Sequence, residues 1–113
     1  NGAFFNNQRI RVSKKNNIND CLFATGGKKD RIIDLPIRKT GCAALDMAYV
    51  AAGRYDGYFQ EDLNLWDIAA GIILIKEAGG VMNDIDLNKT QNIKVIASSI
   101  DINAKLREKL GKF

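Results

Sequence analysis

The sequence predicts an α/β fold in which helices pack in layers against one mixed sheet. Residues 68–75 are all apolar or Gly, and the stretch over residues 65–80 that contains them is long enough to favour a buried helix over a strand. Residues 41–53 are rich in alanine and predict a second helix. Short runs of β-branched and aromatic residues around these helices are typical of interior strands. The strands are expected near Cys21, Tyr58, Val81 and Val95.

The length and composition fit a single domain over residues 1–113. A chain of this length buries roughly two-thirds of its unfolded surface when it folds. Its 46% hydrophobic and 27% charged residues are ordinary for a globular protein. No apolar run approaches the ~20 residues of a membrane-spanning helix, and no signal peptide is visible. We therefore expect a cytoplasmic protein without membrane contact.

The charged and nucleophilic residues exclude several kinds of site. The net charge of +4 arises from 17 Lys and Arg against 13 Asp and Glu, and it favours a solvated surface over a nucleic-acid face. Cys21 and Cys42 lack the spacing of a metal motif, so we expect reduced, buried thiols. The absence of His excludes a Ser-His triad, a Cys-His pair and a His-ligated zinc within these residues.

The N-terminal part of the chain predicts a hairpin followed by a central strand. Residues 3–13 alternate around the polar pair Asn6-Asn7, with Ile10 and Val12 expected to face inward. Because the chain begins at Asn1, we interpret it as a fragment of a longer protein. The apolar run at residues 21–25 then suits a strand covered on both faces. The Gly pair that follows favours a plain turn over a phosphate loop.

The helix over residues 41–53 is expected to begin at Thr40 as its N-cap and to stop at Gly53. Its alanines keep it thin, so a neighbouring element can approach closely. The free N–H groups of its first turn form a site suited to an oxygen-rich ligand.

The next segment leads to the helix around which the chain is arranged. A strand over residues 54–60 is expected to bring Gln60 to the end of the sheet. Asp67 stands where the N-cap of the helix over residues 68–78 belongs. Because this helix is apolar on all sides, we expect it to be packed on more than one face. After it we expect strands over residues 81–84 and 93–99, and a terminal helix over residues 104–110 capped by Asn103.

Trp66-Asp67, followed by Ala-Ala-Gly and then by Glu77-Ala78-Gly79-Gly80, resembles the C-terminal signature of the inositol monophosphatase family. The segments over residues 2–13 and 41–46 resemble further parts of that family. The resemblance implies a layered α-β-α sandwich with a mixed sheet, like the C-terminal half of that fold. Residues 28–38 depart from it, because most members carry a longer segment with a helix there.

The resemblance also implies roles for particular residues. Asp67 matches a residue that binds metal in the family. Gly41, Cys42 and Ala43 match the residues that contact the hydroxyl groups of the family's substrates. Gln60 stands where the sugar-alcohol phosphatases usually have Glu, which leaves the substrate choice open. The alternative for Asp67 is a purely structural helix cap. No catalytic residue is expected here, because the family's Glu-Glu and Asp-Pro-x-Asp-Gly-Thr segments do not occur in the chain.

The resulting functional hypothesis is the C-terminal half of a Mg2+-dependent phosphatase acting on inositol phosphate or related small sugar phosphates. The catalytic N-terminal half is absent from these residues, and a homodimer is expected. Two alternatives stay open: a 3′(2′),5′-bisphosphate nucleotidase or fructose-1,6-bisphosphatase of the same superfamily, and a non-enzymatic module that binds protein or RNA. Contact with nucleic acid or a transcription factor is not indicated by the sequence itself.

Overall fold

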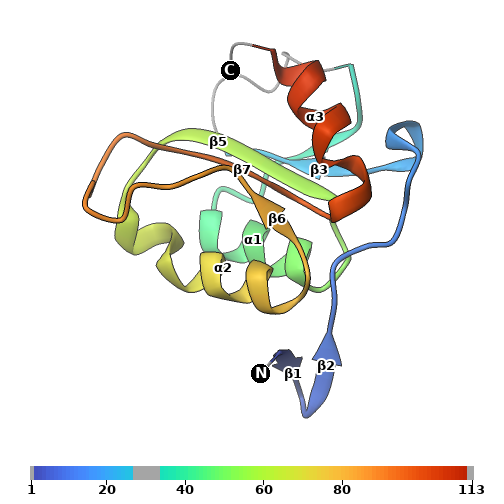
Figure 1. Ribbon diagram of the computed structural model, residues 1–113, viewed down its shortest axis with the longest axis horizontal. Coiled ribbons are helices and arrows are strands. Elements are labelled where there is room, and N and C mark those ends of the chain that lie inside the picture. The colour runs from blue at the N-terminus through green and yellow to red at the C-terminus, as the bar shows by residue number, and fades with distance from the viewer. Residues whose placement is uncertain (1, 27–33, 112–113) are drawn as a thin grey trace.

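The computed structural model describes residues 2–26 and 34–111, and it contains a five-stranded mixed sheet with helices on both faces (Figure 1). The strand order is β4-β3-β5-β7-β6. The strands are β3 (Phe23–Ala24), β4 (Ile37–Arg38), β5 (Gly57–Leu63), β6 (Val81–Met82) and β7 (Ile93–Ser98). The helices are α1 (Ala43–Ala51) and α2 (Leu65–Glu77) on one face and α3 (Asn103–Leu110) on the other. The α-β-α sandwich predicted from the sequence is confirmed.

Two apolar clusters fill the spaces between the layers, because successive residues of a strand point to opposite faces. On β5, Tyr58 packs with the residues of α1 and α2, whereas the next residue, Phe59, packs with those of α3. On β7 the side chain of Ile96 faces α3, and its neighbours Val95 and Ala97 face the other way. The antiparallel pairing of β5 with β7 sets Phe59 opposite Ile96. The side chains of both strands therefore alternate between the two faces of the sheet in step.

The buried carboxylate of Asp56 joins three segments at one end of the sheet. Its Oδ2 accepts a hydrogen bond from Leu22 N at 2.7 Å and lies 3.3 Å from Lys15 Nζ. The backbone of Asp56 donates to Leu22 O at 2.8 Å and accepts from Ser99 N at 3.2 Å. The approach to β3, the start of β5 and the end of β7 are therefore held together at this one residue.

Helices α1 and α2 approach closely at Gly71. A Cβ atom built at Gly71 would lie 2.7 Å from Sδ and 2.9 Å from Cβ of Met47 on α1. No residue larger than Gly fits at this position without moving Met47. The buried stripe of α2, which comprises Ile68, Gly71, Ile72 and Ile75, faces α1 and the sheet.

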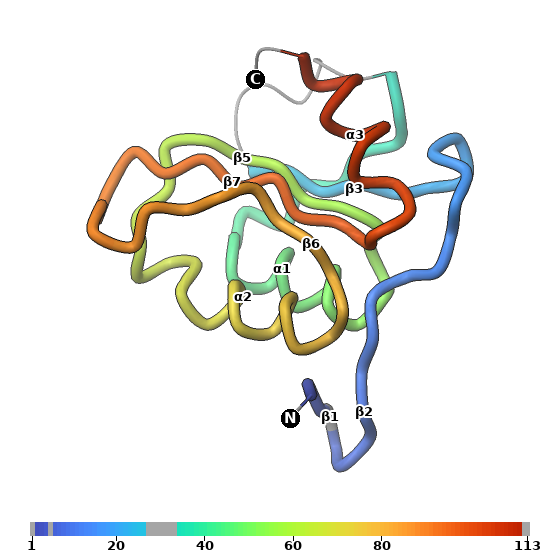
Figure 2. The backbone as a smooth tube through the Cα atoms, viewed as in Figure 1, coloured from blue at the N-terminus to red at the C-terminus, as the bar shows by residue number. Residues whose placement is uncertain are grey.

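The N-terminal hairpin has the predicted form. Strands β1 (Ala3–Phe5) and β2 (Gln8–Ile10) pair antiparallel around Asn6 and Asn7, which both have positive φ. Asn tolerates this conformation better than most residues, and two such residues form a hairpin turn. The hairpin lies on the side of the sheet that carries α1 and α2 (Figure 2). Val12 N donates to Ala78 O at 3.1 Å and so ties the hairpin to the end of α2.

The expected environment of α2 was wrong on two points. The helix begins at Leu65 with Asn64 as its N-cap, so Asp67 lies within the first turn and does not cap the helix. Within the described residues only one stripe of α2 is packed, because Trp66 is 70% and Ile73 63% exposed. An apolar sequence around a helix does not specify which face another element covers, and here the outer face stays open.

The predicted caps of the other two helices were also wrong. Cys42 is the N-cap residue of α1 and Ile102 that of α3. The predicted stop at Gly53 is confirmed by its φ of 76°, which favours Gly after the last helical residue. Two short 3₁₀ turns, Ile18–Asp20 and Ile100–Ile102, complete the connections.

Two further expectations concern the segment over residues 28–38 and membrane-spanning helices. The shortened segment at residues 28–38 falls mostly on residues 27–33, which lie outside the described residues. Over residues 2–26 and 34–111, no helix combines the length and the apolar character that a bilayer crossing requires.

We predict that Gly71→Ala destabilises the fold through the contact with Met47. Overpacking costs about 1–3 kcal/mol, whereas replacing Gly within a helix returns only about 0.5–1 kcal/mol. Urea denaturation should show a lower unfolding free energy for the variant. In a Met47→Ala background the same change should cost less, because the clash with Met47 Sδ is gone and only the contact with the Cβ atom of residue 47 remains. Equal costs in both backgrounds would contradict this account of the helix contact.

Candidate functional site

An open pocket of about 430 Å³ lies where α1 and α2 begin, beside the end of β3. All of the site residues predicted from the sequence line it. These are Gly41, Cys42, Ala43, Gln60 and Asp67. Reasoning from the sequence missed four further wall residues, namely Gly26, Ala44, Leu63 and Trp66. The Gly pair after β3 was the available signal for Gly26, and Trp66 belongs to the motif that singled out Asp67.

The turn before α1 is held by a buried carboxylate. Thr40 Oγ1 accepts from Cys42 N at 3.1 Å and donates to Asp46 Oδ1 at 2.8 Å. Gly41 lies between Thr40 and Cys42 and has a φ of 80°, a conformation that favours glycine. Asp46 is fully buried, and burial raises the pKa of its carboxyl, while the bond from Thr40 opposes that rise. Asp46 therefore fixes the rim of the pocket from within the core.

The first turn of α1 presents backbone donors to the pocket. No side chain caps this helix, and the first N–H groups of any α-helix have no partner within the helix. Ala43 and Ala44 stand in this turn and line the pocket. The helix dipole adds partial positive charge at the same end. This wall of the pocket is thus suited to oxygen atoms that accept hydrogen bonds.

Gln60 lines the pocket from the sheet, in the middle of β5. The expectation that it ends the strand was wrong, because β5 continues to Leu63 through an irregularity at Asp62, whose φ is 61°. Gln60 nevertheless stands beyond the last pair between β5 and β3, in which Tyr58 faces Ala24. Tyr58 Oη donates to Gln60 Oε1 at 2.5 Å. Burial, and then the charge of Asp46, raises the pKa of Tyr58, so this hydroxyl keeps its proton.

Asp67 contributes a solvent-exposed carboxylate to the pocket wall. Carboxylate oxygens suit hard cations such as Mg2+, which are commonly held by one or two carboxylates together with water and substrate phosphate. Within residues 2–26 and 34–111, no group of three or more Asp, Glu, Cys or His side chains could hold a metal ion. Asp67 therefore fits as a single ligand of a shared metal site and does not form a complete site.

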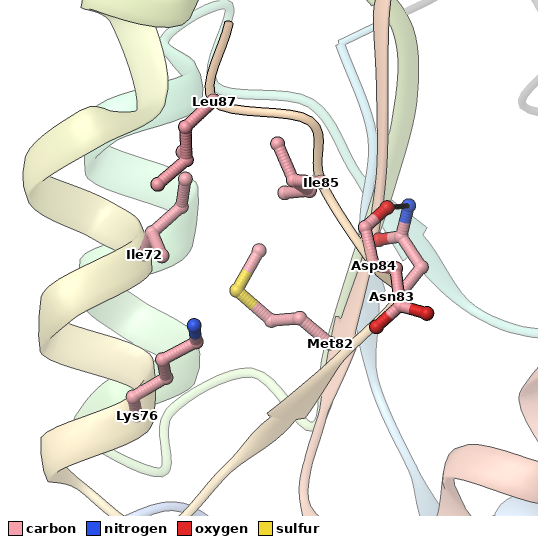
Figure 3. A pocket seen from close by; sticks show the side chains of 7 residues that line it. All are labelled: Ile72, Lys76, Met82, Asn83, Asp84, Ile85 and Leu87. Atoms are coloured by element: carbon pink, nitrogen blue, oxygen red, sulfur yellow. Dashed lines mark hydrogen bonds between the residues drawn. The ribbon is translucent and has the colours of Figure 1, made fainter.

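A second pocket, of about 230 Å³, lies between α2 and the segment that follows β6. Figure 3 shows Ile72, Met82 and Leu87 around it, with Lys76 at one end. Asn83, on the strand side, donates from Nδ2 to Lys94 O at 2.8 Å. None of the predicted site residues lines this pocket. Its wall mixes apolar side chains with Lys76, Asn83 and Asp84. The pocket beside Asp67 is the candidate site because it gathers the residues predicted from the sequence.

The expectation that both thiols are buried was wrong for one of them. Cys21 is 2% exposed, whereas Cys42 is exposed and lines the pocket. Cys42 is exposed because the N-cap position of α1 lies at the pocket rim.

A model of the inositol monophosphatase family matches residues 1–112. The chain belongs to this family. The inositol-1-monophosphatase of Rhizobium meliloti is 41% identical over 100 residues, which are 75% of this chain and 38% of that protein. The fructose-1,6-bisphosphatase/inositol-1-monophosphatase of Thermotoga maritima is 45% identical over 92 residues, which are 74% of this chain and 36% of that protein.

Further relatives carry a different name. The Nus factor SuhB of Pseudomonas aeruginosa is 40% identical over 100 residues, which are 74% of this chain and 37% of that protein. The crystal structure of the extragenic suppressor protein suhB from Bartonella henselae superimposes with a TM-score of 0.86 at 42% identity. The superposition covers 98% of this chain and 50% of the Bartonella henselae chain. The chain thus spans about half the length of these inositol monophosphatase relatives or less.

We predict that iodoacetamide at pH 8 alkylates Cys42 and leaves Cys21 unmodified in the folded protein. Burial, and then the charge of Asp56, raises the pKa of Cys21 to about 11, so little of the reactive thiolate is present. Peptide mass spectrometry should find Cys21 labelled only after unfolding in urea. A Cys42→Ser variant should take up no label when folded. Equal labelling of the two thiols in the native protein would contradict this assignment.

Proposed function

We propose that the pocket at the starts of α1 and α2 is part of a Mg2+-dependent phosphatase site for inositol phosphate or related small sugar phosphates. One observation carries this proposal: Asp67 and the residues expected to contact a sugar line the same pocket, although they lie on different elements. Membership of the inositol monophosphatase family supports it. In this proposal residues 1–113 are a single domain that forms the C-terminal half of the enzyme. The catalytic half and most of the metal ligands precede it.

The residues of this chain would divide the work between binding and metal coordination. Asp67 would hold Mg2+, which when bound supplies charge that polarises the phosphate and activates water. Gly41 and Ala43 would bind and orient the oxygen atoms of the substrate through their N–H groups. Cys42 would contact the substrate through its small side chain, because its N–H donates to Thr40 Oγ1. Gln60 would fix the sugar from the sheet side of the pocket. Trp66, which is 70% exposed beside Asp67, would shield that side of the pocket from water.

We predict that Asp67→Asn, in the protein as its gene encodes it, lowers Mg2+-dependent phosphate release by at least about ten-fold. This estimate follows from the 10- to 100-fold effects typical of residues that support a metal ligand. Because Asp67 is exposed and does not cap α2, the thermal unfolding midpoint should hardly change.

The matched control for that experiment is Asp62→Asn. Asp62 is exposed, carries the same charge and does not line the pocket, so its removal should leave turnover unchanged. Wild-type turnover with unaltered Mg2+ dependence in Asp67→Asn would reject the metal role.

We also predict that residues 1–113 alone hydrolyse no phosphate monoester above background. A single carboxylate at the pocket cannot hold the ions that the reaction needs, and the described residues offer no larger cluster. A malachite-green assay of the purified 113-residue chain with inositol 1-phosphate and Mg2+ measures this directly. Mg2+-dependent phosphate release by that chain would overturn the proposed division between two halves.

Two alternatives belong beside this proposal. A 3′(2′),5′-bisphosphate nucleotidase or a fructose-1,6-bisphosphatase would use the same pocket. Measuring phosphate release from each candidate substrate separates these activities from an inositol phosphatase. The Pseudomonas aeruginosa relative is named a Nus factor, which favours the other alternative, a non-enzymatic module that binds protein or RNA. That function would be supported if the gene's sequence upstream of Asn1 lacks the family's acidic metal-binding segments. We further propose a cytoplasmic homodimer, on the resemblance to the family.

A further inference from the structure

Strand β6 lies at one edge of the five-stranded sheet, and the backbone groups of Met82 face away from the sheet. Among the described strands, β7 is the only neighbour of β6, and Met82 pairs with Ala97. In the same register, Asn83 N donates to Ile96 O at 3.1 Å. Hydrogen-bonded and non-hydrogen-bonded pairs alternate along an antiparallel ladder, so Met82 belongs to a non-hydrogen-bonded pair. Its N–H and C=O therefore point outward, away from β7.

The side chain of Asn83 ends the pairing of β6 with β7. Its Oδ1 accepts from Ile96 N at 2.7 Å, and its Nδ2 donates to Lys94 O at 2.8 Å. The amide thus takes the bonds on β7 that the backbone of a longer β6 would make. In the part of the chain that the structure describes, the outward N–H and C=O of Met82 have no hydrogen-bond partner. An unpaired strand edge of this kind can accept a further extended chain.

The second pocket lies where a strand added to β6 would place its side chains. Met82 packs against the core between the sheet and α2, and paired residues of neighbouring strands share a face. A residue that pairs with Met82 from outside would therefore point its side chain toward this pocket. Figure 3 shows the Met82 side chain reaching toward Ile72, with Lys76 at one end of the cavity and Leu87 at the other. No aromatic ring is found among the described lining residues, so the walls suit an aliphatic side chain.

Lys76 adds a positive charge that has no partner yet. Its ammonium makes no hydrogen bond or ion pair with any other residue that the structure describes. Asp84 also lines the pocket, but Figure 3 places it on the strand side, apart from Lys76. Alternate residues of a strand lie about 7 Å apart on one face. An acidic residue two positions from the inserted side chain would therefore be suited to Lys76.

We propose that the edge of β6 and the second pocket bind an extended segment of a partner protein, which adds to the sheet as an antiparallel strand. The segment carries an aliphatic residue opposite Met82, whose side chain enters the pocket, and an acidic residue two positions away, which pairs with Lys76. Because β6 is only two residues long, main-chain hydrogen bonds alone would hold the segment weakly. The pocket and Lys76 supply the selectivity. None of the residues that line this pocket lines the pocket beside Asp67.

The test uses the protein as its gene encodes it and a capped, fluorescein-labelled peptide, Thr-Glu-Thr-Leu-Thr-Glu-Thr. Glu on both sides of Leu covers both places from which an acidic residue could reach Lys76. A matched peptide carries N-methyl-leucine, which keeps every side chain and removes the N–H that would donate to Met82 O. We expect fluorescence anisotropy to give the first peptide a dissociation constant of about 1 mM or lower. The second should bind at least about ten-fold more weakly, because it leaves an acceptor without its donor.

No binding of the first peptide, or equal binding of both peptides, would overturn the proposal. The role of Lys76 is tested with Lys76→Glu, which should weaken binding of the first peptide at least about three-fold. The matched control is Lys105→Glu, which makes the same charge change at an exposed position of α3, on the other face of the sheet. Equal weakening in the two variants would show general charge attraction and reject the site.

Hydrogen exchange of the Met82 amide, followed by NMR, separates a free edge from one that is already covered. In the protein without peptide this amide should exchange rapidly. Adding the first peptide at about ten times its dissociation constant should slow the exchange about ten-fold, and the N-methylated peptide at the same concentration should slow it far less. Slow exchange without peptide would show that a second copy or another segment of the protein occupies the edge, and the proposal would fail.

Discussion

The close approach of α1 and α2 at Gly71 is the constraint on which the candidate site depends. Gly71 lets Met47 fill the space where a side chain of α2 would otherwise stand. The two helices therefore run close enough together for the start of α1 and the first turn of α2 to line one pocket. The sheet below them supplies the third wall through Gln60. A wider separation of the helices would leave the donors of α1 and the carboxylate of Asp67 on separate surfaces.

Much of the fold could be predicted because local residues determine it. The length of the apolar run fixed α2 as a helix, Asn6 and Asn7 fixed the hairpin turn, and Gly53 fixed the end of α1. Helix starts were less predictable, because Asn64 and Asp67 are both good capping residues and lie within one turn of each other. The open face of α2 could not be predicted, since an apolar helix surface does not reveal which elements the chain brings to it.

The residues of the candidate site were predictable, but the hydrogen bonds that hold them were not. The resemblance carried by the motif around Trp66 identified five residues of the wall, and the structure brings them together, whereas Gly26, Ala44, Leu63 and Trp66 were missed. The bond from Thr40 to Asp46 crosses the start of a helix, and only the folded turn reveals it. The bond from Tyr58 to Gln60 follows from the two-residue period of a strand, a signal that the sequence did contain.

The position of β3 affects the order in which the protein assembles. This strand of two residues lies inside the sheet, parallel to both β4 and β5, and both neighbours follow it in the sequence. Residues 83–92 join β6 to β7 and residues 25–36 join β3 to β4, whereas residues 25–56 lie between β3 and β5. Because short loops close at a lower entropic cost, the topology favours early pairing of β3 with β4 and of β6 with β7, before either pair joins β5. Gly26 follows β3 directly, so the ligand pocket acquires this wall only when the pair β3–β4 docks on β5.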